Sequence, residues 1–233
     1  MRHRLALIAL LIISIHAYGQ HKPAFSINYG LKTGFSSTIY DVDEFTILHT
    51  PIMEYTSHSE ISSFYTGFVR LNMKRHYLQT ECSYNISKYS ISFPIKEWYP
   101  VTESQESSAI YTKITGIEFP FYYGYHIIRD GDYGMSFFMG PKAKFVITDI
   151  SNHIFEKLPF SNVAETIHPI NFSLMLGLGI NISPVFFDFS FEYGLHNISD
   201  HFDATLFNGE ISQDLLVFDR RKNVLSFSIG FMF

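Results

Sequence analysis

The sequence is poor in cysteine and in charge, and beyond its first residues it has no long hydrophobic run. Cys82 is the only cysteine, so an intrachain disulfide is impossible and a small apolar strand residue is its expected role. The formal net charge of −5 argues against nucleic-acid binding, which needs a basic face. After residue 19, no stretch approaches the about 20 apolar residues of a membrane-spanning helix. A fold held by intrachain disulfides and a helical membrane protein are therefore excluded, and the charge balance argues against a nucleic-acid binder.

The one substantial apolar run lies at the start and predicts a secretory signal peptide over residues 1–19. It begins with two arginines, continues as an apolar run over residues 5–15 and ends in Ala17-Tyr18-Gly19, which suits cleavage before Gln20. Loss of the two arginines takes the formal charge from −5 to −5 − 2 = −7. No cysteine follows the cleavage point, which argues against a lipoprotein anchor. Residues 20–233 are expected to form one barrel domain, since barrels commonly exceed about 200 residues.

What the sequence has in abundance is alternation of apolar with small or polar residues. In the last segment, Leu225–Phe233, the odd positions are large and apolar, whereas the even positions hold Ser, Ser, Gly and Met. Because side chains alternate across a strand, this segment has one apolar face and one mostly polar face. The pattern recurs over residues 25–36, 64–73, 78–86, 116–123, 134–145, 171–181 and 187–196. These segments predict eight strands.

The strand over residues 64–73 is the one with ambiguous parity. Tyr65, Val69 and Leu71 are assigned to the apolar outer face, but Phe64 and Phe68 then point inward. Elsewhere the inner positions hold mainly small or polar residues. The orientation of this strand therefore stays open at the level of the sequence.

Connection lengths alternate as regularly as the side chains. Short links fall at residues 74–76, 129–132 and 183–184, and long ones at residues 38–61, 88–110, 148–168 and 199–220. Tight turns on one side and long loops on the other are typical of outer-membrane barrels, with the turns periplasmic. The sequence thus predicts an all-β fold, an eight-stranded antiparallel up-and-down transmembrane β-barrel with four long extracellular loops. Ten strands are the alternative if a long loop contains a hairpin.

A soluble eight-stranded barrel would place the apolar face inward, around a ligand. That face carries Phe, Tyr, Leu and Met almost throughout, and eight strands enclose little room. Many glycines lie on the polar face and suit a crowded interior, so the apolar face is predicted to meet lipid. Leu176 is then expected to point outward and not to tolerate Arg. Gly177 is expected to point inward and to tolerate Ser.

Several motifs resemble the PorT-like outer-membrane beta-barrel family of Bacteroidetes. The matching segments are Tyr29-Gly-Leu-Lys-Thr-Gly-Phe35, Leu78-Gln-Thr-Glu-Cys-Ser-Tyr84, Ile117-Glu-Phe-Pro-Phe-Tyr-Tyr123, Gly140-Pro-Lys-Ala-Lys144, Tyr193-Gly-Leu-His-Asn-Ile198 and Val224-Leu-Ser-Phe-Ser-Ile-Gly-Phe231. They span nearly the whole chain after the signal peptide, in the order of the family. The resemblance implies an outer-membrane barrel. The family's namesake serves a protein secretion system, but its long N-terminal region has no match here.

Charged residues assigned to the inner face are the first candidates for chemistry. Neighbouring carboxylates could serve acid–base catalysis. Paired charges that fill a narrow lumen are the better interpretation, because unpaired buried charge is costly. A plugged lumen is therefore predicted, with a proton or ion path as the alternative. The residues are Lys32, Arg70, Lys142, Lys144, Lys222, Glu81, Glu118, Asp188 and Glu192.

The predicted long loops hold three further groups. The first is His196, Asp200, His201 and Asp203, whose spacing matches no standard zinc site, and His196-Asn-Ile-Ser199 lacks the His-x-Ser spacing of lipid A deacylases. The second group is acidic and could collect divalent cations, although solvated surface is the favoured interpretation. The third is aromatic and predicts an interface belt or a recognition surface. The acidic and aromatic groups are Asp41, Asp43, Glu44, Glu54, Glu60, Phe93, Trp98 and Tyr99.

Taken together, these features predict a non-enzymatic outer-membrane β-barrel protein. Its role is expected to be membrane-structural, or surface-binding through its long loops. The alternative is a small conduit or an accessory component of a protein secretion system. No catalytic, cofactor-binding or metal-binding residue is predicted. The expected partners are outer-membrane lipid, lipopolysaccharide and the barrel-assembly machinery during biogenesis.

Overall fold

The computed structural model describes residues 25–47, 50–51, 55–94, 107–154, 160–206, 211–212 and 216–233. The predicted signal peptide, residues 1–19, and its cleavage point lie outside the described residues. Within those ranges, no helix has the length and apolar character needed to cross a membrane.

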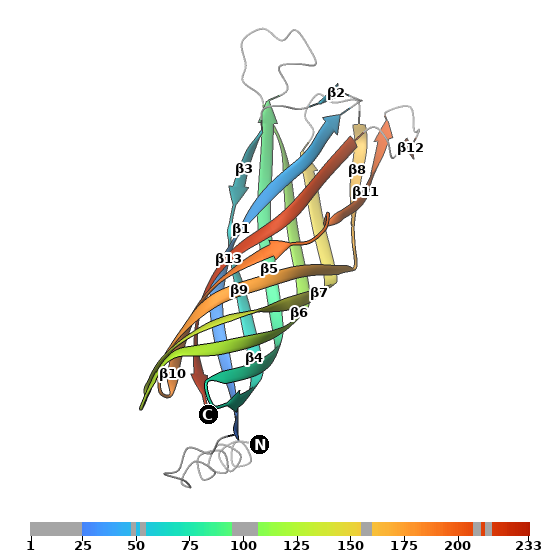
Figure 1. Cartoon of the computed structure of the whole chain (residues 1–233). Helices are drawn as coiled ribbons and strands as arrows, with labels where there is room; N and C mark the ends of the chain where they lie inside the picture. The colour runs from blue at the N-terminus through green and yellow to red at the C-terminus, as the bar shows by residue number, and fades with distance from the viewer. Residues whose placement is uncertain are drawn as a thin grey trace, which may run out of the picture.

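Eight long antiparallel strands close into a barrel (Figure 1). Each pairs with the next in chain order, and the last pairs with the first from Gly30–Met232 to Ile47–Leu216. Beyond this ladder, backbone hydrogen bonds of 2.8 and 3.0 Å join Phe233 to Tyr29. The strands are β1 (Phe25–Ile47), β4 (Ile61–Met73), β5 (His76–Pro94), β6 (Ser107–Asp130), β7 (Tyr133–Ile154), β9 (Ile170–Ile182), β10 (Val185–Gly194) and β13 (Leu216–Met232). The predicted eight-stranded barrel is confirmed.

The predicted tight turns are also confirmed, at residues 74–75, 131–132 and 183–184. They lie at the same end of the barrel as the C-terminus (Figure 1). Lys74 and Gly131 have positive φ angles of 56° and 57°, which are the angles that close tight turns between antiparallel strands. The long connections therefore all lie at the opposite, extracellular end.

The strands run much further into the predicted long loops than expected. β1 has 23 residues and β6 has 24, whereas a tilted transmembrane strand needs only about 9–11. On the outer face the apolar side chains give way to charge at Asp41, Lys88 and Lys113. The pairing of β1 with β13 continues past that boundary to Ile47–Leu216. Inward residues there, such as Phe45 and Ile47, stay buried. The sequence missed this extension because the outer face above the lipid is polar, so the alternation fades while the pairing persists.

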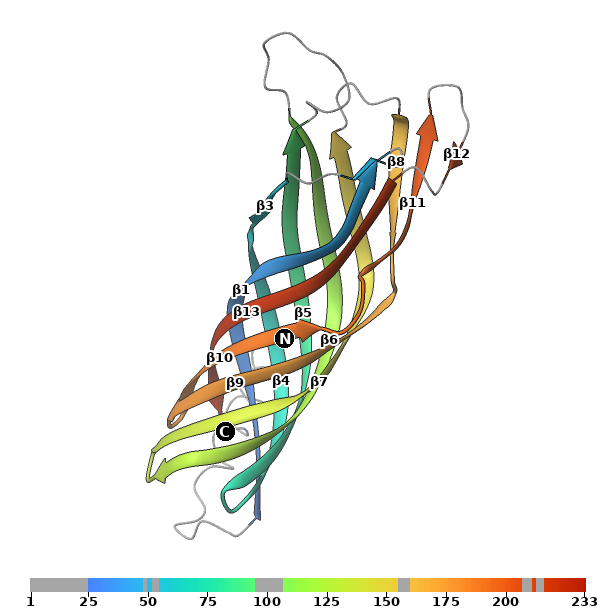
Figure 2. The same ribbon diagram turned by 45° about the horizontal axis from the view of Figure 1, so that its top comes forward.

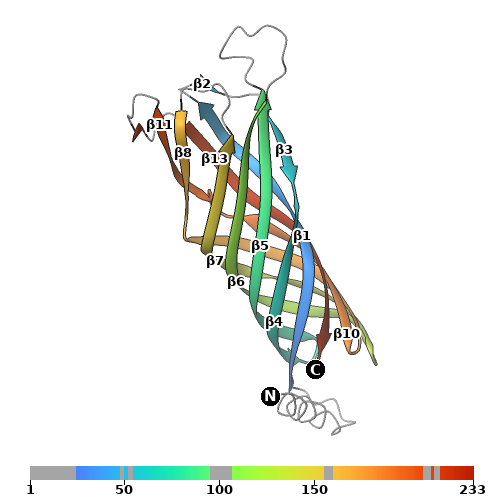
Figure 3. The ribbon, with the colours of Figure 1, turned by 180° about the vertical axis from the view of Figure 1, so that it is seen from behind.

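Short strands complete the extracellular end. β2 (Thr50–Pro51) pairs with β1, and β3 (Thr56–Ser59) pairs with β5. A separate sheet, here called the flap, consists of β8 (Phe160–Ile167), β11 (Ser199–Leu206) and β12 (Ile211–Ser212). Figures 2 and 3 show β8 and β11 side by side above the wall formed by β9 and β10.

A buried ion pair ties the flap to the barrel. Arg220 of β13 is fully buried, and its Nη2 lies 2.5 Å from Glu165 Oε1 of β8. Ser199 of β11 donates to the same carboxylate oxygen. The guanidinium also stacks 4.5 Å from the ring centre of Phe218. Each charge therefore has a partner in the protein, as a buried pair requires.

The apolar face points outward, as predicted. Leu176 is 41% exposed and Phe231 is 51% exposed, whereas the inward Lys142 and Asp188 are buried. A soluble barrel with an apolar interior is therefore the wrong alternative. Cys82 is exposed on the outer face of β5, which agrees with its expected role on a strand.

The uncertain orientation of β4 is settled by glycines on the neighbouring strand. Tyr65 and Val69 are exposed on the outer face, and Phe68 is buried in the lumen. Five inward aromatics of the barrel, including both of those on β4, lie directly across from a glycine, which leaves space for the ring, an arrangement known to support glycine in sheets. The pairs are Phe64–Gly34, Phe68–Gly30, Tyr77–Gly124, Phe138–Gly177 and Phe186–Gly230.

This pairing corrects the expectation that Gly177 tolerates Ser. A Cβ at Gly177 would press against the ring of Phe138 and lie 2.6 Å from the carbonyl oxygen of Phe189. Ordinary contact begins near 3.4 Å. The position is inward, as predicted, but the ring of Phe138 already fills it.

Candidate functional site

The lower lumen, nearer the periplasmic turns, is filled by a neutral charge cluster. Lys32 Nζ lies 2.7 Å from Glu81 Oε1 and 3.1 Å from Asp188 Oδ2. Arg70 donates from Nε to Gln79 Oε1, and its guanidinium lies 4.3 Å from the centre of the Tyr77 ring. The two cations and two carboxylates are all buried, and Lys32 is paired as expected, whereas the contacts of Arg70 are with Gln79 and the Tyr77 ring.

Aromatic rings block the lumen at the same level. Tyr77, Tyr122, Phe138 and Met175 form a buried cluster, here called the plug. The rings of Tyr122 and Phe138 stack with centres 4.8 Å apart. The Tyr122 hydroxyl donates to Glu81 and accepts from Gln79 Nε2 at 2.7 Å. Rings and ion pairs thus interlock, which is the close packing expected inside eight strands.

The upper lumen holds a second cluster. Lys142 Nζ lies 2.9 Å from Glu118 Oε2 and is also paired with Glu192. Lys144 Nζ lies 3.5 Å from Glu118 Oε1 and donates to Asn85 Oδ1 at 3.0 Å. Ser173 donates to Glu192 at 2.7 Å. These four charged residues are therefore held by hydrogen bonds and ion pairs across the barrel.

Lys222 gives the upper cluster more positive than negative side chains. Its Nζ donates to Ser87 Oγ at 3.1 Å, and among the described side chains no carboxylate lies within ion-pair distance of it. The upper lumen therefore holds three buried lysines against two buried glutamates. One positive charge is left without a carboxylate in the described upper lumen, and buried charge normally has one.

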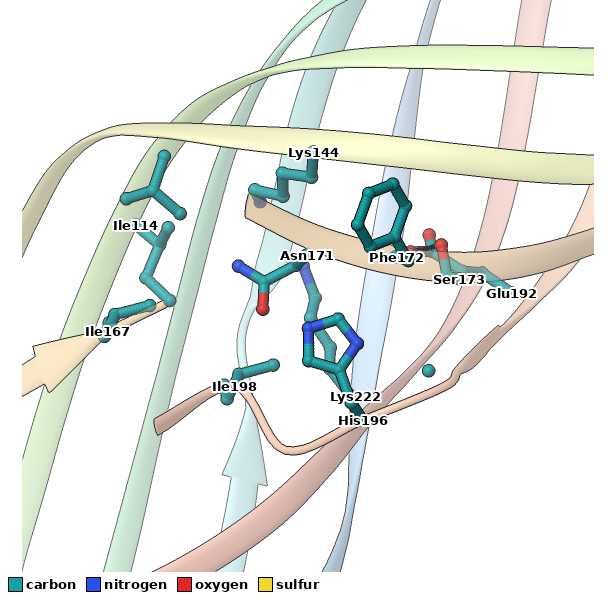
Figure 4. A pocket seen from close by; sticks show the side chains of 12 residues that line it. Ile114, Lys144, Ile167, Asn171, Phe172, Ser173, Glu192, His196, Ile198 and Lys222 are labelled. Atoms are coloured by element: carbon teal, nitrogen blue, oxygen red, sulfur yellow. Dashed lines mark hydrogen bonds between the residues drawn. The ribbon is translucent and has the colours of Figure 1, made fainter. Parts of the chain in front are cut away.

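A pocket lies above this cluster, at the level where β9 and β10 end and the flap begins (Figure 4). Here it is called the vestibule. Ile114, Ile167 and Ile198 form apolar walls, and Lys144, Lys222 and Glu192 are among its polar lining. Its volume is about 30 Å³. A cavity of about 40 Å³ beneath it shares Lys222 and Glu192, so the unmatched lysine faces both spaces.

Polar groups border the vestibule beside the flap. Asn171 Nδ2 donates to the His168 carbonyl at 2.9 Å, while its buried Oδ1 has no donor among the described residues. His196 also lines the pocket, and its ring centre lies 6.2 Å from that of Phe172. Phe172 is exposed on the outer face of β9, so the vestibule reaches the barrel wall.

A third cavity lies below the plug, at the periplasmic mouth. It has a volume of about 230 Å³, and Arg70, Asn72 and Arg129 are among its polar lining. The plug separates it from the two upper cavities. Its described lining shares no residue with that of either upper cavity.

The predicted group of His196, Asp200, His201 and Asp203 comes together only as partly exposed pairs on β11. His201 Nδ1 lies 3.2 Å from Asp200, and its Nε2 lies 3.6 Å from Asp203. No group of three or more potential metal ligands occurs within the described ranges. Ser199 is buried against Glu165 and Arg220 rather than beside a histidine, so the predicted histidine group and this serine do not come together.

The acidic and aromatic loop groups are scattered. Asp41 and Glu44 lie exposed on β1, and Asp41 is 3.6 Å from Arg221. Glu60 is exposed between β3 and β4. The structure describes Asp43 and Phe93 as strand residues but not their side chains, and Glu54, Trp98 and Tyr99 lie outside the described residues. The described acidic residues therefore make no shared cation site.

Sequence reasoning found every charged residue of the two lumen clusters but missed the plug and the flap anchor. The plug residues Tyr77, Tyr122 and Phe138 lie on polar faces, and the glycines opposite two of them were the signal that could have revealed them. Arg220 and Glu165 had no such signal. They lie 55 residues apart, in segments predicted to be loops.

Comparison with known proteins places the chain among outer-membrane barrels. The family model "Outer membrane protein beta-barrel domain" matches residues 18–200. Among curated proteins, none matches the chain. A similar solved structure is OprG from Pseudomonas aeruginosa, with 9% identity, a TM-score of 0.47 and coverage of 88% of this chain and 95% of that one.

Two other solved structures are similar at comparable identity. Ail from Yersinia pestis, in complex with the heparin analogue sucrose octasulfate, has 10% identity, a TM-score of 0.38 and coverage of 89% and 99%. The translocator domain of the autotransporter NalP from Neisseria meningitidis has 9% identity, a TM-score of 0.31 and coverage of 99% and 96%.

Proposed function

From the premise that this chain belongs to the outer membrane protein beta-barrel domain family and resides in the outer membrane, we propose that it is a closed barrel that acts through its extracellular end. The plug carries the proposal. Tyr122 and Phe138 stack across the lumen, and Lys32 lies between Glu81 and Asp188 at the same level. A lumen filled in this way leaves binding, rather than conduction, as the function.

The extracellular end supports a recognition role. Several strands continue well past the apolar band, and the flap is anchored there by Arg220 and Glu165. A buried pair of this kind holds one defined arrangement of strands instead of a set of mobile loops. Functional residues commonly lie on loops and strand ends that a rigid scaffold positions. A non-enzymatic binding surface fits these features, because the buried groups Ser199, Glu165 and Arg220 are engaged with one another in the anchor.

Lipopolysaccharide is the lipid partner that we propose for the outer face. Lys88 and Lys113 are directly paired across β5 and β6, and both are exposed where the apolar band ends. Like charges opposite one another destabilise a sheet unless a counter-charge lies between them. A lipid phosphate at headgroup level would supply that counter-charge.

Membership of the PorT-like branch is a finer proposal, supported by the motifs Tyr29–Phe35, Ile117–Tyr123 and Gly140–Lys144. Each of these segments lies on a strand of the barrel, at β1, β6 and β7. A role as a conduit or secretion accessory is the second candidate. The plug does not favour a conduit.

Conductance of the purified protein in planar bilayers tests the closed barrel. We expect no large, steady conductance from the native protein, and a porin-sized conductance would contradict the proposal. Neighbouring variants locate the block. Tyr122→Ala removes the lumen ring, whereas Tyr123→Ala removes an outward ring of the same size. We expect ionic conductance from Tyr122→Ala and none from Tyr123→Ala. If neither variant conducts, the Tyr122 ring is not what closes the lumen.

A further inference from the structure

We propose that the vestibule is a binding site for a small carboxylate with a short hydrocarbon body. The proposal goes beyond the closed barrel and does not depend on what the outer surface of the flap binds. It rests on the lining of the pocket, the charge of its floor and the size of the recess.

The lysines at the bottom of the vestibule favour a negatively charged ligand. Lys222 and Lys144 both line the vestibule, and Lys222 is the buried lysine of the upper lumen that has no carboxylate within ion-pair distance among the described side chains. Lys144 already shares Glu118 with Lys142. A ligand carboxylate placed against Lys222 would give the upper lumen three negative groups against three positive ones. Such charge-assisted hydrogen bonds are the strong ones in a buried setting.

The apolar walls and the small volume of the vestibule favour a ligand with a short hydrocarbon body. Ile114, Ile167 and Ile198 surround the upper part of the pocket (Figure 4), so a hydrocarbon body would contact apolar surface. The recess of about 30 Å³ is roughly two to three times the about 10–15 Å³ that one water needs, so it can hold the carboxylate head, and the hydrocarbon body would extend out of it between the isoleucines. The buried Asn171 Oδ1, which has no donor in the described part of the chain, marks the same space as a polar recess.

The flap gives the site its upper boundary. Ile167 ends β8, and Ile198 precedes β11, so two of the three isoleucines come from flap segments. The anchor between Arg220 and Glu165 fixes these segments above Lys222. A ligand in the vestibule would therefore contact both the barrel and the flap.

Calorimetric titration of the full protein in phosphatidylcholine nanodiscs tests the proposal, with butyrate as the probe and butyramide as its neutral isostere. Saturable butyrate binding is expected, with a preference over butyramide of roughly tenfold or more, which is the effect of one charge-assisted hydrogen bond. Absence of saturable butyrate binding, or equal binding of butyramide, would overturn the proposal.

Two variants assign the preference to its residue. Lys222→Met removes the charge while keeping an unbranched side chain, and it is expected to abolish the preference for butyrate. Lys74→Met removes a charge at the exposed periplasmic turn and is expected to bind like the native protein. Heat-dependent gel mobility checks that each barrel is folded. An unchanged preference in folded Lys222→Met would overturn the proposal. Neither result alters the conductance test, so the two proposals fail separately.

Discussion

Gly177→Ala is predicted to destabilise the barrel although it adds a single methyl group. The new Cβ would press on the ring of Phe138 and lie 2.6 Å from the Phe189 carbonyl oxygen, where ordinary contact begins near 3.4 Å. The ring cannot withdraw freely, because it stacks on Tyr122 within the plug. Overpacking of this kind costs about 1–3 kcal/mol.

Gly67 offers the matched control on β4. A Cβ there would meet only Leu31 Cδ2, at 3.7 Å. Gly67→Ala should be neutral, or should stabilise by about 0.5–1 kcal/mol, because Ala loses less conformational freedom than Gly in a strand. The two variants should therefore differ by about 1–4 kcal/mol in the free energy of unfolding.

The assay is urea unfolding in lipid vesicles, followed by the gel-mobility difference between folded and unfolded barrels. Equal unfolding free energies for Gly177→Ala and Gly67→Ala would refute the reasoning. They would show that the plug rings can move to admit a methyl group without a loss of stability, so the lumen would be less tightly packed than the stacked rings imply.

The remaining predictions concern the two faces of the wall. Leu176→Arg places charge among lipid and should cost about 2–4 kcal/mol by the same unfolding assay, whereas Thr148→Arg, exposed where the apolar band ends, should cost about 0–1 kcal/mol; equal costs would contradict the assigned membrane boundary. Lys142→Met leaves two buried carboxylates short of their shared cation and should cost about 3–5 kcal/mol. Lys222→Met removes the unmatched charge and should cost much less, so a loss as large as that of Lys142→Met would reveal a carboxylate partner for Lys222.

The sequence by itself determined the number of long strands, their order and, for every strand except β4, which face the alternating side chains occupy. Side chains on a strand alternate with a period of two. The inward and outward faces of a segment such as Leu225–Phe233 can therefore be assigned from its own residues, without knowing its neighbouring strands. The inward position of Lys142 and Glu118 follows in the same way. Turn length then places the short connections together at one end.

Tertiary structure decided which residues meet across the lumen. Lys32 and Asp188 are 156 residues apart, and their contact depends on the stagger of all the strands between them. No local pattern reports that stagger. The plug was decided in the same way, because Tyr77 enters the lumen only where Gly124 faces it in register.

The flap and its anchor likewise exist only in the folded barrel. Above the lipid both faces of a strand can be polar, so the alternation that identifies membrane strands no longer reports pairing. Arg220 and Glu165 appear in sequence as loop charges, yet both side chains are fully buried. These side chains are buried only because the barrel is closed and the flap is anchored to it. The hydrophobic pattern along a single strand therefore cannot predict their burial.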